Sequence, residues 1–300
     1  IPFTGGWAVF IGFWLGVLLA YLLVPEFAAG LGQYLPGVFA AHLLIFLGGV
    51  VDDFVDLAAW LKLAIQATAA MILIASGLKI DTIYIPFTGS FLLGDLTYPA
   101  TILWVLVIVN AVNIVDGLDG LAAGLSVITS IGLLYVGLTL QVPVVVGLAV
   151  ILLGVLPAFL RFNYANASIF LGDSGAQSIG FVFAVAAIYF PIKSYTVVAM
   201  FVPLLSLGVP LVELALSFVR RLLVGKPVMA GDYGHLFHVL VKRGLSHRAT
   251  VLVFYAVAVS LQIFVFTLFL FDRRVVFSIL VLFMMVTAAW FLRLSRQEER

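Results

Sequence analysis

Six of the ten aspartates of this chain lie in three short polar strings, each at the end of a long apolar segment. The strings are Asp52-Asp53 with Asp56 three positions on, Asn113 to Asp119, and Gly172-Asp173-Ser174. Carboxylates are costly beside lipid and are rarely kept there without a function. Grouped carboxylates can bind a divalent cation, hold a basic group, or act as a base or nucleophile. We therefore expect the strings to converge on one site.

The string around Asn113 is the most specific of the three. Asn110, Asn113 and Asp116 recur every three residues, which predicts one shared helix face. A glycine follows Asp116 and another follows Asp119, as suits a helix end where the backbone approaches a ligand. Asparagines can also join apolar helices by hydrogen bonds. That alternative does not account for two carboxylates and two glycines at the same end.

Gly172-Asp173-Ser174 precedes another apolar segment. Free N–H groups at a helix start bind phosphate, and a carboxylate there can bind the Mg²⁺ of a diphosphate. An N-cap role for Asp173 or Ser174 is the alternative. Beside the other strings, metal binding by Asp173 is favoured.

A fourth string carries histidine. His235 and His238 stand three apart in the basic loop 221–248, which ends in Ser246-His247-Arg248. Histidines on one face with Lys and Arg nearby would suit a nucleotide diphosphate. Zinc needs further close ligands, and a lipid-surface patch is the alternative for the basic residues. His42, alone in an apolar segment, is interpreted as a hydrogen-bonded structural residue.

Composition defines the class of protein. Of 300 residues, 64% are hydrophobic and only 10% are charged, against about 25% charged in soluble domains. The fold class is therefore all-α, a polytopic transmembrane bundle. The chain has no cysteine, which excludes disulfides, and a net charge of +1 with no basic tract, which gives no reason to expect nucleic acid as a partner.

The chain has ten apolar segments, and most of them approach the length of a membrane span. They run over residues 7–24, 37–51, 58–76, 99–115, 120–140, 142–160, 175–190, 196–220, 249–271 and 274–293. Pro203 and Pro210 predict a kink or break in the eighth segment, and residues 77–98 predict a turn-rich loop with a hairpin. Most Lys and Arg residues lie on the side of the four polar strings, which predicts that this side is cytoplasmic.

The motifs resemble those of the polyprenyl-phosphate N-acetylhexosamine-1-phosphate transferases. That family has an Asp-Asp helix end, then Lys-Leu-x-x-Gln, matched by Lys62-Leu63-Ala-Ile-Gln66. It continues with Asn-x-x-Asn-x-x-Asp-Gly-x-Asp-Gly, Phe-x-Gly-Asp-Ser-Gly and a His-rich cytoplasmic loop, in the order found here. The resemblance implies one membrane transferase domain over residues 1–300, with ten or eleven spans. Because the chain begins at Ile1 with a Pro-x-x-Gly-Gly sequence, we expect a first helix to be missing.

The resemblance also implies a reaction and a site. A UDP-N-acetylhexosamine, with UDP-GlcNAc favoured, gives its sugar-1-phosphate to undecaprenyl phosphate at the cytoplasmic face of the bacterial inner membrane. UMP is released, and the product begins an envelope glycan such as lipopolysaccharide or teichoic acid. Mg²⁺, or Mn²⁺ in its place, is expected on Asp173 and Asp116. Asp52 would position or deprotonate the lipid phosphate beside Asp53, or a carboxylate would attack phosphorus. The expected substrate-binding residues are Lys62, Asn113, Asp119, His235, His238 and Arg248.

Several alternatives stay open. The phospho-MurNAc-pentapeptide transferases share the family, but they usually have Lys at the position of Asp56. An intramembrane prenyltransferase would use Asp52-Asp53-x-x-Asp56 as a diphosphate motif, and a transporter would hold its carboxylates near mid-membrane. The histidine loop departs from the family's His-x-His-His-Arg at Phe237 and Val239, and Tyr233 and Ser168 replace basic residues. These departures leave open how the nucleotide is held and which sugar it carries. A homodimer is also left open.

Overall fold

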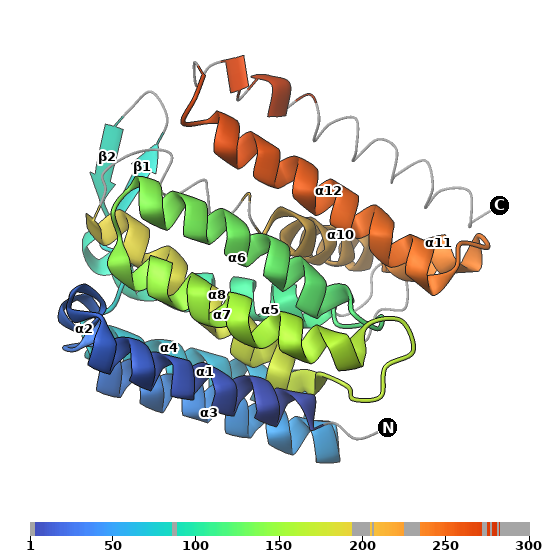
Figure 1. The fold of residues 1–300 in the computed structure, drawn as a ribbon, viewed down its shortest axis with the longest axis horizontal. Helices are drawn as coiled ribbons and strands as arrows, with labels where there is room; N and C mark the ends of the chain where they lie inside the picture. Colours follow the sequence, from blue (N-terminus) through green and yellow to red (C-terminus); the bar gives the residue numbers. More distant parts are fainter. Residues whose placement is uncertain are drawn as a thin grey trace.

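The structure is a computed structural model that describes residues 4–85, 89–193, 207–224 and 235–271, with Leu205 and a few residues between 275 and 282. Helices running side by side make up most of it (Figure 1). The first half contains α1 (Gly5–Leu23), α2 (Pro25–Leu31), α3 (Leu35–Val55), α4 (Ala59–Ala75), β1 (Thr82–Ile85), β2 (Gly89–Leu92), η1 (Gly94–Leu96) and α5 (Thr97–Ile114). The second half contains α6 (Leu121–Thr139), α7 (Pro143–Asn163), α8 (Gly172–Lys193), α10 (Gly208–Val224), α11 (Leu236–Lys242) and α12 (His247–Thr267).

The helices are those of a multi-pass membrane protein. Within the described residues, six are long and apolar enough to cross a bilayer, namely α1, α3, α5 with η1, α6, α7 and α12. Helices α4 and the first part of α10 are apolar but shorter. The expected helical bundle is therefore confirmed, while the expected ten spans are not. The tenth predicted segment, 274–293, lies almost wholly outside the described residues, as does Pro203.

Helix α8 lies at the centre of the bundle and packs against α1, α3, α5 and α7. Its residues from Ser174 to Tyr189 are all buried. Small residues let its neighbours approach closely, because a Cβ on Gly49 of α3 would lie 2.7 Å from the backbone nitrogen of Ser174. A Cβ on Gly6 of α1 would lie 2.6 Å from the nitrogen of Gly175. The start of α8 is thus held between the backbones of α1 and α3.

The predicted hairpin is confirmed. Strands β1 and β2 pair antiparallel, with Thr82 opposite Leu92 and Ile85 opposite Gly89. The hairpin lies at one end of the bundle, and α11 lies at the other (Figure 1). Pro210 lies in the first turn of α10, where the missing N–H of proline has no intrahelical partner to lose.

His42 is buried in α3, but the expected hydrogen bond is not found. Its ring lies among those of Phe10, Phe13, Trp14 and Phe181, with centroid separations of 4.9 to 5.8 Å. Neither ring nitrogen has a hydrogen-bond partner among the described residues. His42 therefore has a structural role, as expected, but aromatic packing holds it in place. The expected hydrogen bond was wrong.

Candidate active site

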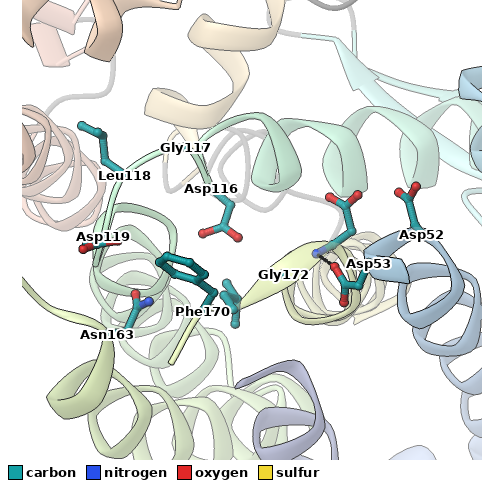
Figure 2. A pocket seen from close by; sticks show the side chains of 11 residues that line it. Asp52, Asp53, Asp116, Gly117, Leu118, Asp119, Asn163, Phe170 and Gly172 are labelled. Carbon is teal, nitrogen blue, oxygen red and sulfur yellow. Dashed lines mark hydrogen bonds between the residues drawn. The ribbon is translucent and has the colours of Figure 1, made fainter. Parts of the chain in front are cut away.

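The three aspartate strings meet around one cavity of about 470 Å³. Figure 2 shows side chains from the end of α3, from the loop after α5 and from the start of α8 turned toward this space. Asp52, Asp53, Asp116, Asp119 and Asp173 all line it. The predicted convergence is therefore observed, at the end of the bundle opposite the hairpin.

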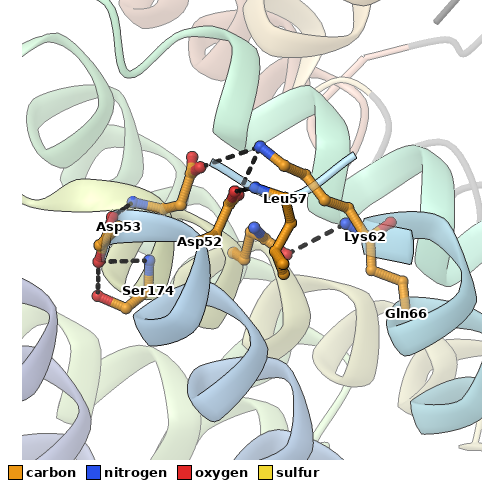
Figure 3. A network of polar contacts seen from close by, with 8 residues as sticks. Asp52, Asp53, Leu57, Lys62, Gln66 and Ser174 are labelled. Carbon is orange, nitrogen blue, oxygen red and sulfur yellow. Dashed lines mark hydrogen bonds and ion pairs between the residues drawn. The ribbon is translucent and has the colours of Figure 1, made fainter. Parts of the chain in front are cut away.

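Lys62 joins two of these aspartates. Its Nζ lies 2.5 Å from Oδ2 of Asp52 and 3.3 Å from Oδ2 of Asp173 (Figure 3). The side chain of Asp52 is almost fully buried, and its Oδ1 accepts a hydrogen bond from the backbone N–H of Leu57. In this arrangement Asp52 is half of an ion pair, which favours a role in placing Lys62 over a role as a free base.

Asp53 caps helix α8. Its two oxygens accept hydrogen bonds from the N–H of Asp173 at 2.6 Å, the N–H of Ser174 at 3.3 Å and the Oγ of Ser174 at 2.7 Å. A helix start has N–H groups without intrahelical partners, and a carboxylate stabilises that end. The sequence pointed to Asp173 or Ser174 as the alternative N-cap, but the cap comes from another helix. These contacts give Asp53 a positioning role beside its predicted catalytic one.

The asparagine string divides at the end of α5. The helix ends at Ile114, so Asp116 lies beyond the helix face predicted to hold it with Asn110. The amide of Asn110 donates to Gln66 at 2.6 Å, and Gln66 donates to Gln177 at 3.2 Å. Asn110 therefore joins α5 to α4 and α8, which is the interhelical role weighed as the alternative. The Oδ1 of Asn113 is buried without a hydrogen-bond partner among the described residues.

Residues 115–120 form the loop between α5 and α6. This 115–120 loop places Asp116 and Asp119 at the cavity. Oδ2 of Asp119 accepts a hydrogen bond from the N–H of Ala167. Asn163, at the end of α7, accepts from the N–H of Gly120 and donates to the carbonyl of Ile169. It also lines the cavity, and the sequence analysis missed it. Its only signal was a polar residue closing an apolar helix.

The donor set fits a divalent cation. Burial raises the pKa of Asp116 to about 8, and nearby carboxylates add to the increase; these belong to Asp173, Asp53 and Asp119. Such an excess of negative charge is relieved by a cation. Among the described residues, no three acidic or histidine side chains are close enough to share one ion. Mg²⁺ commonly uses one or two carboxylates with water and substrate phosphates, so Asp116 and Asp173 would suffice.

The histidine string lies beside the cavity without lining it. Phe237 is buried in α11, and its ring fills the space where a Cβ on Gly117 would stand. His235 and His238 flank that ring, with centroids 5.3 and 4.4 Å away. Burial, followed by the charges of His235 and Lys242, lowers the pKa of His238. The Nδ1 of His235 lies 3.0 Å from Oε1 of Glu213 in α10, a partner that the sequence analysis missed.

Arg248 lines a different, smaller space. With Asp119, Tyr164, Asn166 and His247 it surrounds a cavity of about 120 Å³. Asp119 lines both cavities, so the two adjoin at this residue.

Two departures of the histidine loop have a structural reason. Phe237 and Val239 are 1% and 3% exposed, so both positions contribute to packing. Ser168 is exposed, with its Oγ donating to the carbonyl of Phe162. Tyr233 lies outside the described residues.

Residues 35–191 match the model of glycosyl transferase family 4. This stretch contains the Lys62 helix and all three aspartate strings. The chain belongs to glycosyl transferase family 4. It is 35% identical over 258 residues to a probable undecaprenyl-phosphate N-acetylglucosaminyl 1-phosphate transferase of Bacillus subtilis, covering 86% of this chain and 70% of that relative. It is 37% identical over 279 residues to the decaprenyl-phosphate N-acetylglucosaminephosphotransferase of Mycobacterium tuberculosis, covering 85% and 69%.

A third relative matches a similar share of the chain at lower identity. The undecaprenyl-phosphate alpha-N-acetylglucosaminyl 1-phosphate transferase of Escherichia coli K12 is 27% identical over 273 residues, with 88% of this chain and 71% of the relative covered. The family resemblance read from the motifs is therefore confirmed.

Proposed function

We propose that this chain transfers N-acetylglucosamine-1-phosphate from UDP-N-acetylglucosamine to a polyprenyl phosphate such as undecaprenyl phosphate. An oxygen of the lipid phosphate attacks the sugar-bearing phosphorus of the donor. The bond between that phosphorus and the bridging oxygen breaks, and UMP leaves. The product is a lipid-diphosphate-sugar. We place the reaction at the cytoplasmic face of a bacterial inner membrane.

One observation carries the proposal: five aspartates from three distant segments line a single cavity at one end of an apolar bundle. A cavity at a helix end can receive a water-soluble nucleotide while the lipid tail stays among the helices. The relatives act on polyprenyl phosphates by their names, which supports the same acceptor here.

The residues that line the cavity, together with Lys62 and Asn113, would have different roles in the proposed transfer reaction. Mg²⁺ bound at Asp116 and Asp173 would stabilise the negative charge of the transferring phosphoryl group. Lys62, held by Asp52, supplies a positive charge at the same place for the lipid phosphate. Asp53 fixes the start of α8 and with it Asp173. Asn113 has a free buried oxygen that suits a substrate donor group.

The test is UMP release by purified protein in detergent, with UDP-N-acetylglucosamine, undecaprenyl phosphate and Mg²⁺. Asp116→Asn and Asp173→Asn should abolish it. Asp56→Asn is the control, because Asp56 is exposed and does not line the cavity. Wild-type release that needs both lipid and metal supports the proposal. No UMP release from the folded protein, with release of pyrophosphate when a prenyl diphosphate is supplied instead, would support the prenyltransferase alternative.

A further inference from the structure

Glu213 is a buried acid that the reaction scheme above does not use. It is 1% exposed in α10. Its Oε1 accepts a hydrogen bond from the N–H of Leu236 at 2.9 Å and contacts Nδ1 of His235 at 3.0 Å. Its Oε2 is buried without a hydrogen-bond partner among the described residues. A buried carboxylate is costly unless it is paired, so this contact is a specific one.

The contact determines which nitrogen of His235 can reach a ligand. An ionised carboxylate can only accept hydrogen bonds, so the Nδ1 that faces it must carry a proton. Nε2 is then the ring nitrogen left for another partner. With a second proton on the ring, Nε2–H is a donor suited to a phosphate oxygen. Carboxylates orient metal-binding histidines in the same way.

The ring of His235 is also held on its flat side. It stacks on Phe237 with 10° between the planes, and Phe237 packs against Gly117 at the cavity. The side chain of His235 is 11% exposed to solvent. Glu213 at one edge and Phe237 on one face therefore fix the ring one aromatic layer from the cavity, with part of it still at the surface.

We propose that Glu213 is a positioning residue for the donor nucleotide. It holds His235 with a protonated Nδ1 inward, so that Nε2, when it is protonated as well, donates a hydrogen bond to a phosphate oxygen of the UDP-sugar. This inference rests on the proposed function. A purely structural role is the competing explanation, since Glu213 also caps α11 through Leu236.

Glu213→Gln separates the two roles. The amide oxygen can still accept from Leu236 and from Nδ1, so the cap remains, while the charge is lost. We expect the KM for UDP-N-acetylglucosamine to rise roughly tenfold, as fits the loss of one charge-assisted hydrogen bond. The KM for undecaprenyl phosphate and the melting temperature in detergent should stay near wild type. Glu26→Gln, in the exposed first turn of α2, is the matched control and should change nothing.

A double-variant cycle shows whether Glu213 acts through His235. In a His235→Ala background, Glu213→Gln should have no further effect on the donor KM. If the effects of the two substitutions on the donor KM multiply, the inference is overturned. An unchanged donor KM in a folded Glu213→Gln protein would overturn it as well. An equal rise in both KM values with a lowered melting temperature would indicate the structural role and overturn it too.

A second measurement does not depend on turnover. The chain has four histidines, few enough to resolve by ¹⁵N NMR of histidine-labelled protein, with His235→Ala identifying the signal. We expect wild-type His235 to carry a proton on Nδ1, and on Nε2 as well when UDP-N-acetylglucosamine is bound. A neutral ring protonated only on Nε2 would overturn the inference even if UMP release is observed. If NMR shows a protonated Nδ1 but no UMP is released, the proposed function is rejected, whereas the contact between Glu213 and His235 is supported.

Discussion

The aspartates of the cavity are chemically identical, but each has different interaction partners. Asp52 is paired with Lys62, Asp53 binds the backbone of α8, and Asp116 lies among other carboxylates. These partners come from segments up to 121 positions away. The sequence identified the aspartates because charge is rare in apolar segments. The sequence could not show which role each aspartate has, because each role depends on contacts between distant helices.

Removing the cap on α8 should lower stability. Asp53→Ala leaves two N–H groups and one hydroxyl without their acceptor, at a cost of about 1–3 kcal/mol. We expect a lower melting temperature in detergent, measured by intrinsic fluorescence. Asp56→Asn, which removes an exposed charge from the end of the same helix and keeps a residue that tolerates its left-handed φ of 53°, should cost less. Equal melting temperatures for the two variants would contradict the capping role.

Metal binding should depend on pH through Asp116. A carboxyl whose pKa is raised to about 8 must lose its proton before it binds a cation. Mg²⁺ affinity should therefore rise as the pH increases from about 6 to 8 and level off above, by up to about tenfold per pH unit for one proton. Calorimetry in buffers of different ionisation enthalpy measures the proton released. In Asp116→Asn both the proton release and this pH dependence should become smaller, with the remainder coming from Asp173, the other proposed ligand.

Asn163 and Glu213 show where prediction from sequence ends at the residue scale. Each lies in a largely apolar helix, without a spacing to other polar residues that singles it out. Asn163 binds the backbone of Gly120, and Glu213 binds the start of α11. Both act on loops that are distant in sequence, and only the packing of the helices shows this.

The elements themselves were largely predictable. The predicted segment 142–160 corresponds to α7 (Pro143–Asn163), and the predicted hairpin is observed. Long apolar runs and turn residues are strong local signals. Helices α2 and α11 were missed because seven residues are too few to show a period. The end of α5 was predicted too late, since Asp116 continued the spacing after the helix had stopped.

The contact between α11 and the 115–120 loop should be sensitive to a single methyl group. Gly117→Ala would place a Cβ inside the ring of Phe237, which must displace α11 or the loop. We expect at least a tenfold loss of UMP release, since small misplacements at a reacting centre are costly. Phe237→Leu in the same chain should restore part of it by making room. Gly154→Ala, an exposed helical site with no atom near the added Cβ, should be active; an active Gly117→Ala would argue against a fixed contact.

For the whole molecule, the two ends of the bundle should face opposite sides of the membrane. The hairpin lies at one end and α11 at the other (Figure 1), and η1 follows the hairpin directly in the chain. The chain has no cysteine, so single substitutions report position directly. In intact cells, a membrane-impermeant maleimide should label Asp95→Cys and should label Lys242→Cys only after permeabilisation. The reverse pattern would invert the proposed orientation and place the cavity outside.

The glycines at the start of α8 also limit how the cavity can change shape. Gly49 and Gly6 bring three helix backbones into contact there, so α1, α3 and α8 cannot part without opening a void in the bundle. The opposite side of the cavity is a short loop resting on the ring of Phe237. The site therefore has one wall that is fixed by the packing of three helix backbones. We therefore expect the side of the cavity that carries Asp53 and Asp173 to keep its shape when a substrate binds.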